Sequence, residues 1–310
     1  MKVALCFIIN YQHILNKEQI WREWIEHNKD IINVYFYYKD IKQIKSTWIM
    51  KYTLPPNFIY ETSYFHVMPA YMSILKFALE HDTQNKWFCM LTDACCPIIS
   101  PKKFRYLFYN KHNYSLFSWK VAWWNPYYHQ RGNLKKLSKD LWLANDPWFI
   151  LTRENVKQVI NFVSNQKNIT QTICSGGLAN ETLFAVAFKY YNELDNDNKN
   201  SHIICESTHI TDWYRRSSTT SPHLFKDADE DDINFIENEL ERNPYHIFIR
   251  KISPEFPDEI LNYYIYEYKK NIVNKLVLVE PYEMIYNSKY LAILAVGVIL
   301  YLLHIVIVLT

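Results

Sequence analysis

An acidic residue, Asp93, stands where a short apolar run ends and a Cys-Cys-Pro corner begins, within Trp87–Ser100 (WFCMLTDACCPIIS). An apolar run that stops this abruptly is typical of a buried parallel strand. In open α/β sheets, ligands bind at the carboxyl ends of such strands. Ser100 and Pro101 supply an N-cap and a proline at the first helical position, so a helix should follow. The segment therefore predicts a binding crevice with Asp93 beside it.

Two acidic groupings invite a metal assignment, but neither has the pattern of a metal site. Asp227–Asp232 (DADEDD) contains a D-x-D, yet the helix dipole favours carboxylates at a helix N-terminus, and we interpret the run in that way. His209 and Asp212 lack a third ligand at metal spacing. We therefore assign no metal and no cofactor. The four glycines (132, 176, 177 and 297) form neither a P-loop nor a G-x-G-x-x-G turn, which excludes phosphate sites of that type.

Strands and helices should alternate to position these residues. The β-rich runs Val3–Ile9 and Val34–Tyr38 flank an amphipathic stretch around Trp21 and Trp24, which predicts a βαβ unit with parallel strands. Residues 68–79 have helical spacing and precede the strand at 87–91. Further strands are expected at 115–117, 148–151 and 246–249, and helices at 153–163 with Thr152 as cap, 179–190, 230–241 and 257–271. This order predicts one α/β domain with a mixed, mainly parallel sheet.

The composition is that of a globular protein without a nucleic-acid-binding surface. With 310 residues, 49% of them hydrophobic, the chain can bury one large core. The aromatic content of 17% suits ring-shaped ligands and ordinary core packing equally. The formal charge of +2 is spread along the chain, so no basic block for nucleic acid is present. The six cysteines lie mainly in apolar contexts without a C-x-x-C pair, and we expect reduced core residues.

The C-terminal segment Tyr290–Thr310 is uncharged and almost wholly apolar. A helix of this length spans about 31 Å, which matches the hydrocarbon core of a bilayer. We therefore expect a catalytic domain over residues 1–285 and a single transmembrane tail anchor over 286–310. Lys275 and Lys289 lie on the N-terminal side of the segment, so the body should face the cytosol. The apolar run at residues 3–9 is short for a signal peptide and has no cleavage site, which favours a strand there.

Four segments, in order along residues 3–256, resemble motifs of one glycosyltransferase family. Residues 91–98 (LTDACCPI) are similar to L-S-x-x-C-x-P-L. Residues 139–151 (KDLWLANDPWFIL) resemble W-x-x-G-S-x-W-F-x-L, with Trp142 and Trp148 in register and Asn145-Asp146 in place of Gly-Ser.

The other two segments resemble the parts of the family that carry charge. Residues 179–184 (ANETLF) resemble its D-E-x-x-x helix. Residues 209–216 (HITDWYRR) and 248–254 (FIRKISP) resemble the pair Y-x-D-W-S-R and F-A-R-K-F-x-P. The family is that of the core-2/I-branching β-1,6-N-acetylglucosaminyltransferases, which is related to the xylosyltransferases, and the wording is closest to its plant-like branch.

The resemblance implies a glycosyltransferase A-type, Rossmann-like fold and metal-independent transfer from a UDP-sugar with inversion. Glu181 matches the acid that takes the proton of the acceptor hydroxyl. Arg250 and Lys251 would offset the charge of the UDP leaving group, because arginine offers a bidentate fork and lysine a point charge. Either Arg215 or Arg216 would join them. Acceptor or crevice residues are expected at Asp93, Trp142, Asp146 and Trp148.

The sequence thus predicts a membrane-anchored inverting glycosyltransferase that moves GlcNAc or xylose to a glycan or glycoprotein acceptor. The alternative is a catalytically inactive, membrane-tethered binding or assembly protein on the same fold. Asn145-Asp146 favours the alternative, whereas Glu181 and the basic pair oppose it. Sequons at Asn113, Asn168 and Asn180 should be accessible acceptors if the body enters the secretory lumen.

Overall fold

The computed structural model describes residues 1–10, 12–122, 130–194 and 201–268. The chain divides into two units, Met1–Leu261 and Asn262–Thr310. In the second unit the described residues include a π-helical turn, Tyr263–Glu267. The anchor expected at 286–310 lies outside the described residues. Within the described part, no helix is long and apolar enough to cross a membrane.

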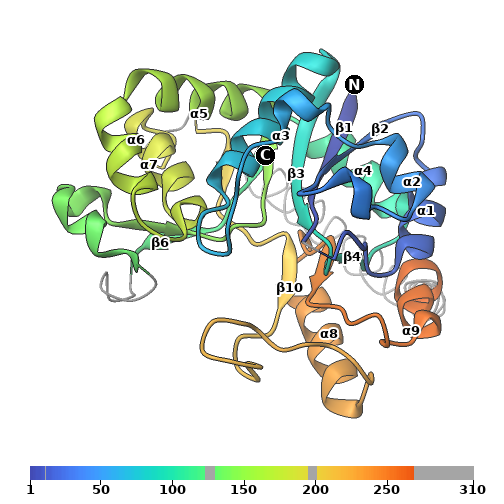
Figure 1. Ribbon diagram of the computed structural model, residues 1–310. Coiled ribbons are helices and arrows are strands. Elements are labelled where there is room, and N and C mark those ends of the chain that lie inside the picture. Colours follow the sequence, from blue (N-terminus) through green and yellow to red (C-terminus); the bar gives the residue numbers. More distant parts are fainter. Residues whose placement is uncertain (11, 123–129, 195–200, 269–310) are drawn as a thin grey trace, which may run out of the picture. The chain divides into compact units, whose positions relative to one another are not determined.

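A six-stranded mixed sheet forms the centre of the first unit (Figure 1). Its order is β2-β1-β3-β8-β5-β9. The strands are β1 (Lys2–Ile8), β2 (Ile32–Tyr37), β3 (Asn85–Thr92), β5 (Ser115–Leu116), β8 (Ile150–Thr152) and β9 (Ile203–Ile204). Strand β1 is parallel to β2 and β3, and β5 is parallel to β9, whereas β8 runs antiparallel to both of its neighbours. The predicted mixed, mainly parallel α/β sheet is confirmed.

Helices cover both faces of this sheet. They are α1 (Glu18–Glu26), α3 (Met68–His81), α4 (Pro101–Lys111), α5 (Arg153–Asn165), α6 (Lys167–Cys174) and α7 (Leu183–Tyr190). One face packs its alternate side chains, such as Ala4 and Phe88, with residues of α3, α5 and α7. The other face meets α1 and α4, where the rings of Phe7 and Trp21 lie 4.9 Å apart. Because both faces are covered, the strands read as continuous apolar runs.

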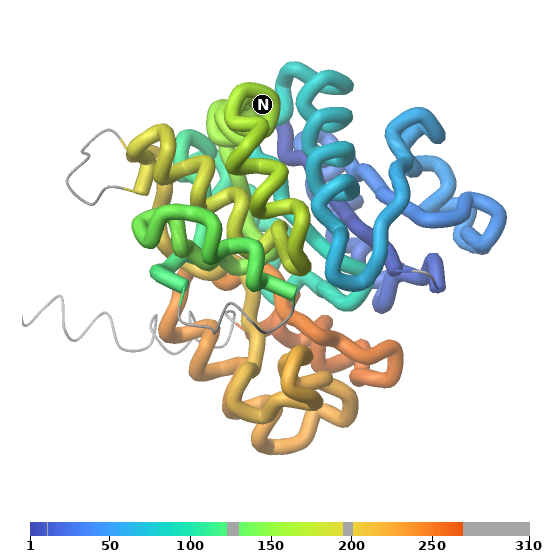
Figure 2. The backbone as a smooth tube through the Cα atoms, turned by 60° about the vertical axis from the view of Figure 1, so that its left-hand side comes forward, coloured from blue at the N-terminus to red at the C-terminus, as the bar shows by residue number. Residues whose placement is uncertain are grey.

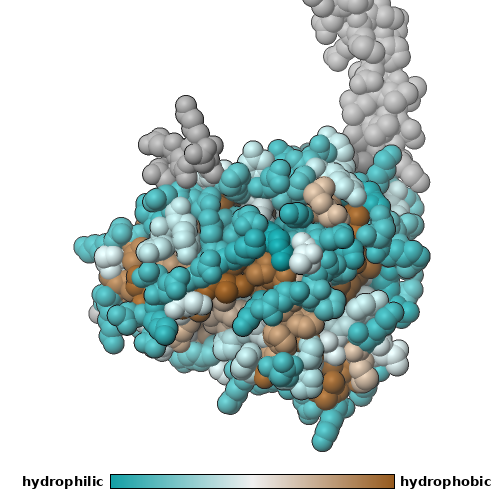
Figure 3. All heavy atoms as spheres, turned by 90° about the horizontal axis from the view of Figure 1, so that it is seen from above, coloured by the Kyte–Doolittle hydropathy of each residue, from teal (hydrophilic) through white to brown (hydrophobic). Residues whose placement is uncertain are grey.

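Figure 2 shows α5–α7, in green and yellow, beside the segment from β1 to α3, in blue and cyan. The face drawn in Figure 3 is mostly hydrophilic, and its hydrophobic side chains show as a central strip and as smaller patches towards the edges.

Two smaller sheets complete the first unit. One contains β10 (His209–Thr211), β11 (Phe248–Arg250) and β4 (Cys96–Pro97), with β11 in the middle. Figure 1 shows β4 and β10 near the ends at which β1 and β3 finish. The other sheet pairs β6 (Trp119–Val121) with β7 (Leu143–Asn145). The shorter helical elements are η1 (Ile41–Gln43), α2 (Thr47–Lys51), η2 (Pro56–Phe58), η4 (Gly132–Lys136), η5 (Lys139–Leu141) and α9 (Asp258–Asn262).

Helix caps account for several of the boundaries. Ser100 accepts a hydrogen bond from the Lys103 amide over 3.1 Å at the start of α4, and Thr152 accepts one from the Asn155 amide over 3.2 Å at the start of α5. Asp229 caps α8 (Glu230–Arg242) in the same way. These caps confirm the two predicted helix starts and the interpretation of the acidic run as a helix N-terminus.

The prediction of one helix over residues 179–190 is wrong. The chain instead forms a 3₁₀ turn, η6 (Ala179–Glu181), breaks at Thr182 with φ −141°, and then begins α7. The turn starts from Leu178 in the left-handed region, φ 57°, so Glu181 lies on a corner rather than on a helix face. Helix α6 was not predicted, because its threonines, isoleucines and asparagine have modest helix propensity.

All six cysteines are free thiols. Cys6, Cys89, Cys95 and Cys96 are buried, as expected, whereas Cys205 is exposed.

Candidate active site

The candidate site begins where β1 and β3 end. The Asn10 side-chain amide donates to the Asp93 carboxylate over 2.7 Å. The indole of Trp21 on α1 donates to the Cys95 carbonyl over 2.9 Å, which fixes the corner after Asp93. Asp93 therefore lies at the carboxyl ends of parallel strands, the edge at which α/β sheets bind ligands.

Strand β11 brings Arg250 to this corner, where the Ile252 amide donates to the Ala94 carbonyl over 2.9 Å. Arg250 is only 4% exposed, and its guanidinium carbon lies 3.2 Å from the centroid of the Trp148 ring. Its Nε and Nη1 atoms are buried and have no hydrogen-bond partner among the described residues. Burial lowers the pKa of Arg250, but arginine still keeps its charge in proteins. A buried cation with unused donors is suited to an anionic ligand.

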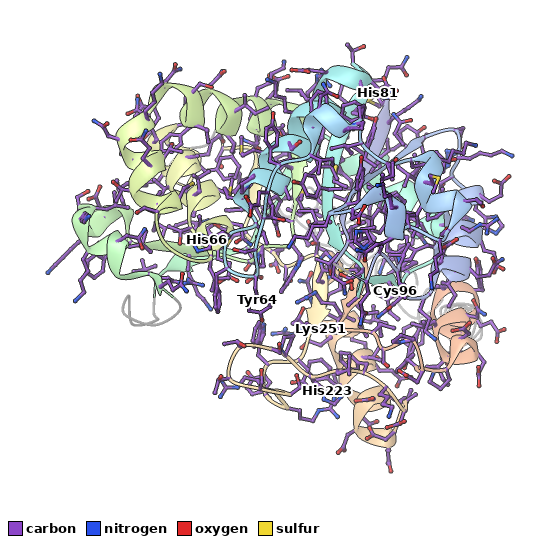
Figure 4. All side chains as sticks on the ribbon, viewed as in Figure 1. Tyr64, His66, His81, Cys96, His223 and Lys251 are labelled. Atoms are coloured by element: carbon purple, nitrogen blue, oxygen red, sulfur yellow. The ribbon has the colours of Figure 1, made fainter. Side chains whose placement is uncertain are left out.

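Lys251 follows directly and extends the positive charge (Figure 4). Its ammonium donates to the Ser221 hydroxyl over 3.1 Å. Burial lowers the pKa of Lys251, the charge of Arg250 lowers it further, and Asp93 opposes both effects. Burial likewise raises the pKa of Asp93, against the two cations. The three charged groups thus act on one another at a single edge of the sheet.

Glu181 lies on the η6 corner and forms an ion pair with Arg131. The Arg131 side chain is buried, whereas that of Glu181 is 28% exposed. Asn145 holds the corner in place, because its side-chain amide donates to the Asn180 carbonyl over 2.9 Å and its oxygen accepts from the Ala185 amide over 3.3 Å. Asn145, which stands where the family motif has Gly, therefore supports the turn that carries Glu181.

Tyr71 and Asp146 link Glu181 to Arg250. Burial raises the pKa of Tyr71, and Glu181 and Arg250 then act on it with opposite signs. Burial also raises the pKa of Asp146, which Glu181 raises further and Arg250 lowers. The contacts of one segment connect the two charges, because Asn145 donates to the carbonyl of Asn180, the neighbour of Glu181, and Trp148 stacks on Arg250. Asp93, Asp146, Trp148, Glu181, Arg250 and Lys251 are therefore brought together.

The remaining predicted residues have other surroundings. Arg215 donates to Asp212 over 2.6 Å and contacts Asp232 at 3.0 Å, so carboxylates of the protein already engage it. Arg216 is exposed. The indole of Trp142 donates to the Leu137 carbonyl over 3.2 Å at the end of η5.

Sequence reasoning did not single out Arg131, Tyr71 or Ser221. Arg131 and Tyr71 are each distant from Glu181 in the chain and carry no local signal. Ser221 ends a run of hydroxyl residues that follows Arg215-Arg216. This run next to two arginines is the sequence feature that could have drawn attention to Ser221.

Two of the hollows in the described part of the first unit bear on the position of the site. The smaller, about 270 Å³, lies beside η6 and is lined by mainly apolar side chains that include Met68, Met72 and Ala179. The larger, about 630 Å³, is open and lies at the amino end of β2 against α1 and α2, away from the carboxyl ends of β1 and β3. The smaller one reaches the turn that carries Glu181 through Ala179, whereas Glu181 itself is not among its lining residues. Over the described residues, no group of three His, Cys, Asp or Glu side chains could hold a metal ion.

Comparison with known proteins shows no family. No family model matches the chain, and no curated protein matches it. Among solved structures, the crystal structure of 4-diphosphocytidyl-2C-methyl-D-erythritol synthase from Anaerococcus prevotii is similar at a TM-score of 0.36 and 10% sequence identity, over 78% of this chain and 97% of that one. A likeness this low carries no argument about function, which rests on the geometry of the site.

Proposed function

We propose that this chain is an inverting glycosyltransferase that moves a sugar, GlcNAc or xylose, from a UDP donor to an acceptor hydroxyl without a metal ion. The segment from Asn145 to Trp148 carries the proposal, because Asn145 holds the turn that bears Glu181 and Trp148 stacks on the buried, partly unsatisfied Arg250. The motif resemblance to the core-2/I-branching family and its glycosyltransferase A-type fold agrees with these roles.

Each group has one task in the proposed reaction. Glu181 takes the proton of the acceptor hydroxyl as its oxygen attacks the anomeric carbon of the sugar. The bond from that carbon to the UDP oxygen breaks at the same time, and Arg250 and Lys251 stabilise the charge that develops on the diphosphate. Trp148 stacks on Arg250 and holds the guanidinium in place. The hollow beside η6, which Ala179 of the Glu181 turn lines, offers an apolar surface for the acceptor.

Release of UDP from a panel of UDP-sugars tests the proposal. UDP-GlcNAc or UDP-xylose should release UDP in an acceptor-dependent manner, and turnover should continue in excess EDTA. Activity that disappears with EDTA and returns with manganese would exclude the metal-free mechanism. No release with any donor, although UDP binds, would favour a different role.

That different role is a membrane-tethered binding or assembly protein on the same fold. The ion pair between Glu181 and Arg131 favours it, because a carboxylate that already binds a buried arginine is less available to an acceptor hydroxyl. One assay distinguishes the two roles, because a binding protein would retain affinity for UDP or the acceptor but would show no turnover.

A further inference from the structure

A hydroxyl-rich loop, residues 217–222, lies between β10 and α8 and contacts Lys251. Ser217, Ser218, Thr219, Thr220 and Ser221 follow one another in the chain and precede Pro222. Ser218 and Ser221 form an antiparallel bridge with hydrogen bonds of 3.3 and 3.4 Å. Residues 217–220 are exposed, whereas Ser221 is partly buried. We call this segment the hydroxyl hairpin.

The chain on either side of the hydroxyl hairpin is held by buried charges. On one side, Arg215 contacts the carboxylates of Asp212 and Asp232. On the other, the His223 ring lies 2.8 Å from Asp232, and the His223 amide donates to the Asp212 carbonyl over 2.8 Å. These contacts fix where the hairpin leaves and rejoins the fold, so the position of Ser221 is set by the structure around it.

Ser221 meets Lys251 at the candidate diphosphate site. The Ser221 hydroxyl oxygen lies 3.1 Å from the Lys251 ammonium, and Lys251 is adjacent in the chain to Arg250, whose Nε and Nη1 atoms are unused. An anion held by Lys251 therefore lies within reach of the Ser221 hydroxyl. That hydroxyl can donate one hydrogen bond while its lone pairs still accept from the ammonium.

We propose that Ser221 is a diphosphate-binding residue whose hydroxyl donates to a phosphoryl oxygen of the donor, an inference that rests on the proposed function. Arg250 and Lys251 supply the charge, and the hydroxyl hairpin supplies a directed neutral donor. The ligand class is a nucleoside diphosphate, and free pyrophosphate shares the chemistry that Ser221 recognises.

Calorimetric titration of the full chain with UDP, uridine and inorganic pyrophosphate tests this role. Ser221→Ala should weaken UDP and pyrophosphate binding about tenfold, which is the usual effect of losing a hydrogen bond to a charged group. Uridine binding should not change, and Ser221→Thr should restore the affinity because it keeps the hydroxyl. The matched control is Thr219→Ala, an exposed hydroxyl of the same hairpin, which should bind as the wild type does. Unchanged UDP affinity in Ser221→Ala overturns the inference.

A second comparison separates direct binding from mere support of Lys251. In a Lys251→Ala background, Ser221→Ala should still weaken pyrophosphate binding by about twofold or more. No further loss in that background would reduce Ser221 to a residue that only holds Lys251, and the inference would be wrong. If the wild type binds pyrophosphate but not UDP, the proposed function is contradicted while the role of Ser221 is still open to test. The effect of Ser221→Ala on pyrophosphate affinity then shows whether Ser221 binds the phosphoryl oxygens.

Discussion

Glu181 does its proposed work from a corner of the chain, where Asn145 holds the turn and Arg131 pairs with the carboxylate. Glu181→Gln keeps nearly the same shape but cannot accept a proton. We expect donor binding to stay as in the wild type, while transfer falls by about 10²–10⁴-fold. The unfolding midpoint should fall, because buried Arg131 loses its charged partner. The measurement is acceptor-dependent UDP release together with UDP titration, and the exposed Glu154→Gln serves as the control.

Retained transfer in Glu181→Gln would move the base to another residue. Asp146 is the first candidate, because it follows Asn145, which holds the turn of Glu181, and because burial raises its pKa. Asp146→Asn would then abolish transfer where Glu181→Gln does not.

At the scale of elements, the η4 segment and the end of α6 position Arg131 against Glu181. The Gly177 amide donates to the Gln130 carbonyl over 2.9 Å, and a Cβ added at Gly176 would overlap that carbonyl oxygen and the Asn133 side chain. We expect Gly176→Ala to lower the free energy of unfolding by about 1–3 kcal/mol. Gly132→Ala is the matched control, because a Cβ there meets nothing within 4 Å, and it should stay within about 0.5 kcal/mol.

Urea denaturation of Gly176→Ala and Gly132→Ala measures the change in the free energy of unfolding for each variant. Equal stability of Gly176→Ala and the wild type would show that the η4 segment moves aside freely. Arg131 would then be a poor anchor for Glu181.

Asp82, at the end of α3, ties β1 and β2 to that helix. Burial is the largest single influence and raises the pKa, but hydrogen bonds from the Gln84 amide, Asn33 and Lys2 outweigh it and lower the pKa of Asp82 to about 2. The unfolded value is about 4, so the stabilisation is complete above that pH and is lost as the pH falls through about 2. The stability difference between the wild type and Asp82→Asn should therefore shrink between pH 4 and pH 2.

Acid unfolding monitored by circular dichroism tests this pH dependence, with the exposed Asp227→Asn as control. A difference between the wild type and Asp82→Asn that stays constant over this interval would contradict it.

Local signals made some elements predictable, and long-range contacts fixed the others. The starts of α4 and α5 were visible because Ser100 and Thr152 cap helices only a few residues away. The break at Thr182 was not visible, since the turn before it is held by Asn145, 35 residues distant from Asn180. The site residues likewise divide into those that a local signal could place and those that depend on long-range contacts. Asp93 could be placed at a strand end from its own segment, whereas the pairing of Arg131 with Glu181 spans 50 residues.

At the scale of the whole molecule, the charge pattern and the thiols bear on where the protein works. All six cysteines are unpaired, including the exposed Cys205. Free thiols are typical of a reducing compartment. Lys275 and Lys289 precede the apolar segment 290–310, and the positive flank of a membrane span faces the cytosol. Both observations support the proposal of a cytosolic body.

N-glycosylation tests this orientation, and the structure shows which sequon asparagines are exposed. Asn113 and Asn168 are exposed, but Asn180 is only 4% exposed, so the expectation that all three sequons are accessible is wrong for Asn180. Expressed in a eukaryotic cell, the protein should show no mobility shift with an N-glycan-removing enzyme. Protease added outside intact microsomes should digest the body. The opposite orientation would give protease-protected protein whose glycans disappear in the double variant Asn113→Gln, Asn168→Gln, because those two side chains are the exposed sequon acceptors.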